Sequence, residues 1–281
     1  MGKIIGIGEI LWDMLPQGKQ LGGAPANFAY HVCRSGGDGW AVSSISDDSL
    51  GREIKDVLAG KNLSACLSEV DAPTGTVAVT LDEAGVPSYE ITEQVAWDMI
   101  PFGPELEMLA SSAEAVCYGT LAQRSEVSRK TIMRFIDAMP EDSLKVYDIN
   151  LRQHYYSKEI ISDSLEVADI LKINDEELEI VSQIFALDGD QAERCRRLID
   201  LFSLELVILT KGSKGSDVVT RDKINTVVPV DVDVVDTVGA GDAFTAAFVV
   251  SYLRGDSIED AHRSADEVST YVCTKAGAMP D

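Results

Sequence analysis

Basic residues are scarce in this chain. Its 281 residues include 24 lysines and arginines against 47 aspartates and glutamates, so the formal net charge is −23 at pH 7. The acidic residues are spread over both halves of the sequence, which is typical of a solubilising surface. A broad surface for nucleic acid or for anionic membranes needs clustered lysine and arginine, so we expect neither partner. The charge does not exclude a small anion held by a local group of donors.

Cysteine and histidine are also few. The five cysteines are widely spaced and contain no CxxC pair, and the three histidines are scattered, so neither a zinc site, a redox motif nor a disulfide framework is predicted. No stretch approaches the roughly 20 apolar residues that a transmembrane helix requires. Near the N-terminus, Glu9 interrupts a short apolar run before a signal-peptide core could form. We therefore expect a cytoplasmic protein.

Three common active-site motifs are missing from the sequence. The phosphate-binding loop Gly-x-x-x-x-Gly-Lys-Ser/Thr is absent, and so is the Gly-x-Ser-x-Gly elbow of α/β hydrolases. Gly6 and Gly8 begin a dinucleotide-binding fingerprint, but Leu11 stands where the third glycine is required. These absences argue against a P-loop enzyme, an α/β hydrolase and a Rossmann dehydrogenase.

The composition, 45% hydrophobic and 25% charged, is typical of a globular protein. Short β-prone runs alternate with segments of helical period, which predicts an α/β fold with a doubly wound, mostly parallel sheet between layers of helices. An early hairpin, 76–81 and 87–92 around the turn-like Asp82–Gly85, interrupts this alternation and predicts a small sheet or lid. The expected strands are 3–7, 115–118, 145–148, 170–173 and 206–209; the expected helices are 26–34, 50–58, 126–139, 162–167, 175–185, 190–202, 240–253 and 257–274.

The strongest local signal is the segment Asp236-Thr237-Val238-Gly239-Ala240-Gly241-Asp242-Ala243-Phe244. Two glycines separated by one residue allow a sharp turn that directs N–H groups to one spot at a helix N-terminus, where an anion is favoured. Asp242, in the first helical turn, would be placed to accept a proton from a hydroxyl that attacks a phosphoryl group. A tight turn with an acid that complements the helix dipole explains the same residues, so this segment alone does not decide.

Four further polar segments each admit a ligand-binding and an ordinary interpretation. Gly22-Gly23-Ala24-Pro25-Ala26-Asn27 offers close backbone approach and a side-chain amide, or simply a loop and helix cap. Asp148-Ile149-Asn150-Leu151-Arg152, Asn174-Asp175-Glu176-Glu177 and Thr210-Lys211-Gly212-Ser213-Lys214-Gly215 each follow a predicted strand. The carboxyl ends of parallel strands form the usual ligand crevice of an open α/β sheet, although a helix cap or a solvated loop accounts for these residues as well.

Taken in order, these five segments resemble the motifs of the ribokinase-like (PfkB) sugar kinases, and the resemblance covers nearly the whole chain. Segment 236–244 is similar to the second family signature, and 22–27 to its Gly-Gly-x-x-x-Asn element. Segments 174–177 and 210–212 are similar to its Asn-x-x-Glu and Thr-Lys-Gly elements. The resemblance implies a three-layer α/β/α ribokinase-like domain over residues 1–281, with a lid formed by segments near 10–25 and 74–98. It also implies ATP-dependent phosphorylation of a sugar hydroxyl.

The resemblance further implies a role for individual residues. Asp242 would be the general base, with charge on the transferred phosphoryl group stabilised by Gly239, Ala240, Gly241 and Arg152. The implied sugar contacts are Asp13, Gly22, Gly23, Asn27, Asn150 and Trp97, and the implied ATP contacts are Asn174, Thr210, Lys211, Gly212, Gly215 and Thr237. Glu177 would support Mg²⁺ through water, and the adenine would lie near 263–277. Some relatives bind a monovalent cation such as K⁺ near residues 236 and 277, and lid strands in the family often pair into homodimers.

Within the family, three segments are similar to bacterial fructokinases: Gly8 through Ala29, Ala96-Trp97-Asp98 and Gly277-Ala278-Met279-Pro280. This similarity implies that the nucleophile is the 6-hydroxyl of D-fructose. A ribokinase, a 2-keto-3-deoxygluconate kinase and an inactive sugar-binding regulatory protein are the alternatives. The presence of Asp242 and both glycines disfavours the regulatory protein.

Overall fold

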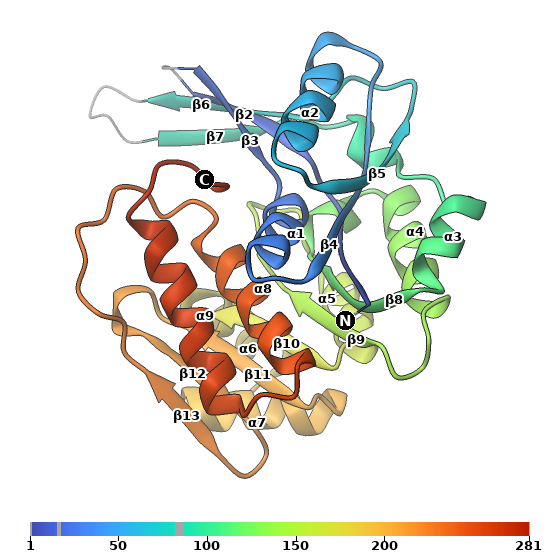
Figure 1. Cartoon of the computed structure of the whole chain (residues 1–281). Helices are drawn as coiled ribbons and strands as arrows, with labels where there is room; N and C mark the ends of the chain where they lie inside the picture. Colours follow the sequence, from blue (N-terminus) through green and yellow to red (C-terminus); the bar gives the residue numbers. More distant parts are fainter. Residues whose placement is uncertain (1, 16–17, 82–86, 281) are drawn as a thin grey trace.

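The large sheet has nine strands and lies between two layers of helices (Figure 1). The structure is a computed structural model that describes residues 2–15, 18–81 and 87–280. Neighbouring strands are parallel except at one edge, where β12 pairs antiparallel with both β11 and β13. In spatial order the strands are β13 (Ile224–Val227), β12 (Ser216–Val219), β11 (Leu206–Thr210), β10 (Ile170–Asn174), β9 (Leu144–Asp148), β8 (Ala113–Tyr118), β1 (Lys3–Ile7), β4 (Asp38–Ile45) and β5 (Ser64–Glu69).

Alternate residues of the central strands belong to different hydrophobic cores. On β1, Ile5 and Ile7 join one cluster whereas Ile4 joins the other, and all three are fully buried. On β11, the residues at 207 and 209 join the first cluster and the residue at 208 joins the second. A strand covered on both faces reads as a continuous apolar run, because neither side-chain direction meets water. The five expected strands and the mostly parallel sheet are confirmed.

Two groups of helices cover the sheet (Figure 1). The first hydrophobic core is closed by helices from the middle of the chain, and the second by helices from its two ends, with α2 packed beside α1. The first group is α3 (Pro104–Ala110), α4 (Glu126–Asp137), α5 (Lys158–Glu166), α6 (Asp175–Phe185) and α7 (Gln191–Phe202); the second is α1 (Ala24–Arg34), α2 (Ser49–Gly60), α8 (Ala240–Leu253) and α9 (Ile258–Cys273). Short 3₁₀ turns are η1 (Ala96–Met99), η2 (Leu121–Arg124) and η3 (Gly212–Lys214).

The helix starts are of two kinds. Side-chain oxygens cap α2, α5, α6, α7 and α9, each accepting a hydrogen bond from a first-turn N–H. By contrast, α1, α3, α4 and α8 have no side-chain cap, and of these α1 and α8 begin at glycines with positive φ, Gly23 (φ 111°) and Gly239 (φ 77°). At α1, Pro25 has no N–H and the Ala26 N–H donates to the carbonyl oxygen of Gly23 at 3.1 Å. At α8, the Ala240 N–H donates to the carbonyl oxygen of Thr237 at 3.3 Å, which leaves the N–H groups of Gly241 and Asp242 for other partners.

A second, four-stranded sheet contains the predicted hairpin. Its order is β3 (Gly18–Gly22), β2 (Leu11–Leu15), β6 (Thr76–Leu81) and β7 (Pro87–Ile91), and β6 and β7 are antiparallel as expected. The turn expected at Asp82–Gly85 lies outside the described residues. Because β2 pairs in parallel with β6, this small sheet joins two segments that lie about 60 residues apart in the chain. Figure 1 shows it at the upper left, beside α2.

Several elements differ from the expectation. Strands β4, β5, β12 and β13 and helix α3 were not expected, and helix 162–167 begins earlier, at Lys158. Strand β13 ends at Val227, and in the valine-rich segment that follows it Val228 and Val230 are 69% and 76% exposed. In the described part of the chain, no helix combines the length and the apolar character needed to span a bilayer. All five cysteines are free thiols in the structure.

Candidate active site

The carboxyl ends of four parallel strands meet at one edge of the large sheet. Asp148, Asn174 and Thr210 are the last residues of β9, β10 and β11, and Glu9 follows the end of β1 by two residues. Neighbouring strands in this part of the sheet are parallel, so these polar side chains share an edge. Ligands bind at this edge in open α/β folds.

The N-terminus of α8 carries the residues that the sequence predicts to bind an anion. Gly239 has a left-handed backbone, and a Cβ atom on it would lie 2.7 Å from the Cα of Ala278, so only glycine fits there. A Cβ atom on Gly241 would lie 3.1 Å from the Nζ of Lys172. The first-turn amides of this 14-residue helix are unpaired within the helix and carry the positive end of its dipole. The geometry suits a phosphoryl group.

Asp242 lies in the same first turn and contacts the start of α1. Its Oδ2 accepts a hydrogen bond from the Nδ2 of Asn27 at 2.8 Å. Burial and the charge of Asp148 raise the pKa of Asp242 to about 7, against the opposing effects of Asn27, Lys172 and Arg152. A carboxylate with a pKa near neutrality is well matched to general-base chemistry.

The predicted sugar-binding residues converge on the same region. Asp13 lies on β2, and a Cβ atom on Gly22 of β3 would come within 2.4 Å of its Oδ2, so the glycine leaves room for the carboxylate. Burial raises the pKa of Asp13 to about 6, and Arg152 acts in the opposite direction. Gly23 then starts α1, which presents Asn27 to Asp242. The Oδ1 of Asn27 is buried and has no hydrogen-bond partner among the described residues.

The loop after β9 places the positive charge of Arg152 near these acidic side chains. Asn150 has a left-handed backbone (φ 42°), and the Leu151 N–H next to it donates to the Oε1 of Glu177 at 2.8 Å. The exposed Arg152 follows, and its charge lowers the pKa of Glu9, Asp13 and Asp242. Arg152 therefore lies close enough to Asp13 and to Asp242 to influence both carboxylates.

Glu177 anchors this loop to the start of α6. Its Oε2 accepts from the Asn174 N–H at 2.9 Å, and its own N–H donates to the Asn174 side chain at 2.8 Å, which forms a capping box. The structure, over the residues it describes, shows no group of three or more His, Cys, Asp or Glu side chains that could hold a metal. A divalent cation would therefore take most of its ligands from a nucleotide and from water. The Glu177 carboxylate is chemically suited to accept hydrogen bonds from such water.

A cavity of about 510 Å³ lies on the other side of the α8 N-terminus. Six predicted ATP contacts or anion-site residues line it together with residues of α9 that no motif had specified. Valines of the segment 229–234 and Phe244 form an apolar part of the lining that suits a flat heteroaromatic ring, and Asp231 lines the cavity beside them. The lining includes Thr210, Gly212, Gly215, Thr237, Ala240 and Gly241 from the predicted set, and Asp266, Ser269, Thr270 and Cys273 from α9, within the region expected to hold the adenine.

Two predicted contacts are not presented to these pockets. The Nζ of Lys211 is 2.7 Å from Asp217 of β12, so its charge is neutralised there and is not free for a phosphate. Trp97 is fully buried, with the Arg124 guanidinium 3.9 Å from its ring centre. Its indole packs against Gly75 beneath the small sheet and offers no exposed face to a sugar.

Two buried charged residues of the site were missed by sequence reasoning. Lys172 is 8% exposed and its Nζ lies 3.1 Å from the Oδ1 of Asp148. Glu9 is 4% exposed, burial raises its pKa to about 7, and its Oε2 has no partner in the described structure. The sequence did contain a signal for each residue. Lys172 is a charged residue inside an otherwise apolar strand, and Glu9 is an acid directly after Gly8, just past the end of the first strand.

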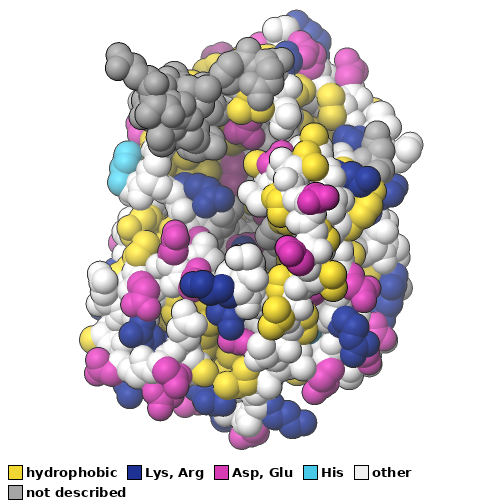
Figure 2. All heavy atoms as spheres, turned by 90° about the vertical axis from the view of Figure 1, so that its left-hand side faces the viewer, with side chains coloured by type: hydrophobic (Ala, Val, Ile, Leu, Met, Phe, Trp, Pro, Cys, Tyr) yellow, Lys and Arg dark blue, Asp and Glu magenta, His cyan; other side chains and the backbone are white. Residues whose placement is uncertain are grey.

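One face of the molecular surface is hollowed. Figure 2 shows the face that is on the left in Figure 1. This face is hollowed near its middle, with acidic side chains inside the hollow and lysine or arginine at its border.

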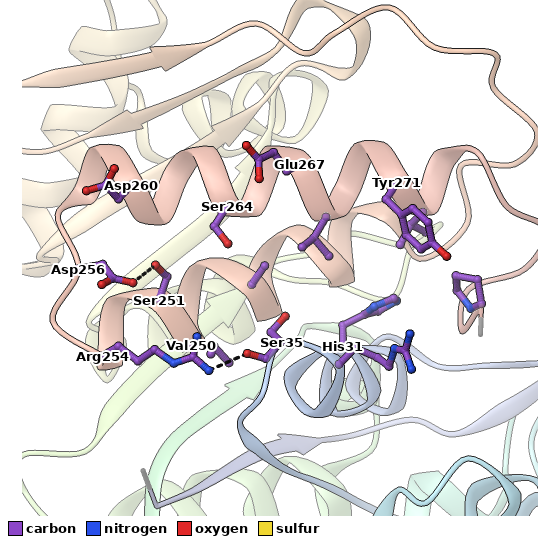
Figure 3. A pocket seen from close by; sticks show the side chains of 15 residues that line it. His31, Ser35, Val250, Ser251, Arg254, Asp256, Asp260, Ser264, Glu267 and Tyr271 are labelled. Atoms are coloured by element: carbon purple, nitrogen blue, oxygen red, sulfur yellow. Dashed lines mark hydrogen bonds between the residues drawn. The ribbon is translucent and has the colours of Figure 1, made fainter.

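A separate cavity of about 550 Å³ lies between α1, α8 and α9 (Figure 3). Its lining includes Ser35, Arg254 and Glu267, and it borders the C-terminal ends of α1 and α8. Glu267 falls within the range 263–277 expected near the adenine, but none of the individually predicted contacts lines this cavity. It is distinct from the site described above.

Comparison with known proteins identifies the family. The family model described as pfkB family carbohydrate kinase matches residues 17–281. The chain belongs to this carbohydrate kinase family. The PfkB signatures therefore account for the glycine motif at α8 and for the order of the motifs along the chain, and the ribokinase-like fold expectation is confirmed.

Relatives of this PfkB kinase cover almost its full length. Fructokinase-2 from Zea mays is 30% identical, over 99% of this chain and 90% of the relative. Among solved structures, an uncharacterised sugar kinase from Pyrococcus horikoshii in complex with ATP has a TM-score of 0.83 and is 26% identical, over 98% and 94% of the two chains. A fructokinase double mutant from Vibrio cholerae, solved with fructose, ADP and a potassium ion, has a TM-score of 0.83 and is 25% identical, over 99% and 94%.

Proposed function

We propose that this PfkB kinase transfers the γ-phosphoryl group of ATP to the 6-hydroxyl of D-fructose. The observation that carries the proposal is the position of Asp242. It is hydrogen-bonded to Asn27 on the side of the sugar-binding residues and stands at the rim of the anion site that opens into the 510 Å³ cavity. The relatives named fructokinase, one of them solved with fructose and ADP, support the choice of sugar.

In the proposed reaction, Asp242 accepts the proton of the attacking hydroxyl. The sugar oxygen forms a bond to the γ-phosphorus while the bond from that phosphorus to the bridging oxygen breaks, and ADP leaves with that electron pair. The backbone amides of Gly239 to Asp242 and the Arg152 guanidinium stabilise charge on the transferred group. Bound Mg²⁺ would neutralise charge on the nucleotide phosphates, and Asn174 and Glu177 are the residues suited to contact its water ligands.

The sugar would be held between the small sheet and α1. Asp13 is ionised at neutral pH because its pKa is about 6, so it can accept hydrogen bonds from two sugar hydroxyls. Asn27 and Asn150 provide amide donors and acceptors beside it, and the glycines Gly22 and Gly23 allow close backbone approach. Closure of the small sheet would exclude water, which otherwise competes as phosphoryl acceptor. We also propose that the small sheet pairs with that of a second copy of the chain to form a homodimer.

A monovalent cation is a second proposed ligand. The Asp236 carboxylate accepts hydrogen bonds from the N–H groups of Val238 and Gly277, both at 3.0 Å, and so joins the loop before α8 to the loop after α9. A cation near these loops would order the anion site through the same connection. The potassium ion in the Vibrio cholerae structure supports this proposal. Turnover in K⁺ that exceeds turnover in tetramethylammonium at equal ionic strength is the expected result; equal turnover would contradict it.

The proposal is tested by ADP release with ATP and Mg²⁺ on fructose, ribose, 2-keto-3-deoxygluconate, glucose and adenosine. We expect the highest kcat/KM on fructose. A best rate on ribose or on 2-keto-3-deoxygluconate would replace fructose by that sugar. Tight binding of one sugar without turnover of any would favour a regulatory sugar-binding protein.

A further inference from the structure

A buried ion pair lies directly beneath the anion site. Lys172 is the third residue of β10, between the fully buried Leu171 and Ile173, and its side chain is 10% exposed. Its partner Asp148, at the end of β9, has a side chain that is 6% exposed. Burying two charges carries a desolvation cost, and replacing such a pair by apolar residues is often neutral or stabilising. Stability alone is therefore a weak reason for this pair.

The pair connects three elements of the active site. The Nζ of Lys172 would lie 3.1 Å from a Cβ atom on Gly241, so the ammonium sits against the backbone of the anion site. The Asp148 carboxylate accepts a bond from Lys172 at Oδ1, and its Oδ2 is 3.1 Å from the hydroxyl of Thr245. That hydroxyl is also 3.0 Å from the carbonyl oxygen of Gly241. The pair thus joins β9, β10 and α8 at the point where phosphoryl transfer is proposed.

The charges around this point are mostly negative. Asp148, Glu177 and Asp242 act on Lys172, and Glu9 and Arg152 complete the set that faces Asp242. Burial lowers the pKa of Lys172, but the three carboxylates more than reverse this effect, so Lys172 is charged at neutral pH. Asp148 raises the pKa of Asp242 whereas Lys172 lowers it. The two partners therefore have opposite effects on the proposed base.

We propose that Lys172 and Asp148 are positioning residues for phosphoryl transfer, which hold the N-terminus of α8 in place and cancel each other's charge beneath it. With the pair intact, the Lys172 and Asp148 charges sum to zero beneath Asp242 and the triphosphate of the bound nucleotide. Without Lys172, the uncompensated Asp148 carboxylate opposes ionisation of the base and repels the phosphates. This inference rests on the proposed kinase function and extends it to two residues that do not contact the sugar.

The test is the pH dependence of kcat/KM for wild type, Lys172→Met, Asp148→Asn and the double variant. Lys172→Met should lower kcat at pH 7 by about 10–100-fold. It should also move the acidic limb of the profile, where kcat/KM falls with decreasing pH, to higher pH by about one unit. Asp148→Asn should move the limb to lower pH, and the double variant should return it close to the wild-type position. Lys172→Arg keeps the charge and should leave the limb in place even if its larger group lowers kcat.

A matched control comes from the other end of β9. Lys145 pairs with Asp169 at 3.8 Å, away from the site, and Lys145→Met should change neither kcat nor the limb. An acidic limb at the same pH in the wild type and all variants would overturn the proposal, and the pair would then have only a structural role. A raised KM for ATP in Lys172→Met with an unchanged limb would also overturn it, in favour of direct phosphate binding. If Lys172→Met does not fold, Asp148→Asn and Lys172→Arg still give different expectations.

The outcome can be separated from that of the proposed function. The variants are compared on whichever sugar the wild type phosphorylates, so a preference for another sugar leaves this test intact. Should no sugar turn over, the proposed kinase function fails by itself. The pair is then tested by ¹³C NMR titration of the Asp242 carboxyl, assigned with Asp242→Asn, where the same opposite shifts are expected and unchanged titration would contradict the proposal.

Discussion

Replacement of Asp242 by asparagine separates catalysis from binding. The amide keeps the size of the side chain, and its oxygen can still accept the hydrogen bond from Asn27 that the structure shows at 2.8 Å. It cannot accept the proton of the attacking hydroxyl. Loss of a general base commonly costs roughly 10²–10⁴-fold in rate, so we expect kcat to fall by about that factor. The dissociation constants of fructose and ADP should change by less than about threefold, as measured by calorimetry.

The same substitution should stabilise the fold in a pH-dependent way. The pKa of Asp242 is about 7 in the folded protein and about 3.8 in an unfolded chain, so ionisation disfavours the folded state. The stabilising contribution of its protonated form is fully present below about pH 4 and is lost as the pH rises through 7. The residue as a whole is only half-buried although its carboxyl is desolvated, so the effect is reduced, and we expect Asp242→Asn to gain about 1–2 kcal/mol at pH 8 and little at pH 4. For a chain of this size, that gain corresponds to an increase of about 2–6 °C in Tm.

Asp260→Asn is the matched control for this prediction. Asp260 lies in the first turn of the neighbouring α9 and is exposed. Its replacement should leave kcat unchanged and should give no gain in Tm that grows with pH. Coupled ADP release and thermal melts at pH 4, 6 and 8 provide both readouts. A kcat for Asp242→Asn within threefold of wild type, or a Tm gain that is the same at all pH values, would refute the assignment of Asp242 as a buried base.

Three further predictions concern the rest of the site. Wild-type kcat/KM should fall tenfold per pH unit below about pH 7 as Asp242 becomes protonated; a flat profile from pH 5.5 to 8 would contradict the raised pKa. Gly239→Ala should lower kcat more than tenfold and reduce Tm, because its Cβ would meet the backbone of Ala278 at 2.7 Å, whereas Gly60→Ala, with open space around it, should do neither. Asp13→Asn should raise KM for fructose about 10–100-fold and leave KM for ATP unchanged in the coupled assay; equal effects on both would argue against a sugar contact.

The central strands and the backbone geometry of the glycine motif could be predicted because their signals are local. The apolar run Leu206–Leu209 reports burial on both faces of a strand, and the glycines around Ala240 report backbone geometry that few other residues adopt. Strand β4 was missed because Gly39, Ser43 and Ser44 dilute its apolar pattern, although both serines are buried by packing that only the folded chain provides.

Partners that are distant in sequence explain the remaining differences. Lys211 was expected at the nucleotide, but Asp217 takes its charge, and a motif cannot show which acid a lysine will meet. Trp97 was expected at the sugar, but Arg124 covers its ring from 27 residues away. The valine-rich segment between β13 and the glycine motif is largely exposed and lines the 510 Å³ cavity, and its apolar composition alone does not show this position.

The most direct measurement of the central claim is the identity of the product formed from fructose, ATP and Mg²⁺. Proton-coupled ³¹P NMR of the reaction mixture distinguishes a phosphate ester at carbon 6 from one at carbon 1 and from inorganic phosphate. We predict fructose 6-phosphate in equimolar amount with ADP, and its loss in Asp242→Asn. Inorganic phosphate as the only phosphorus product besides ADP, or an ester at another carbon of fructose, would contradict the proposed reaction.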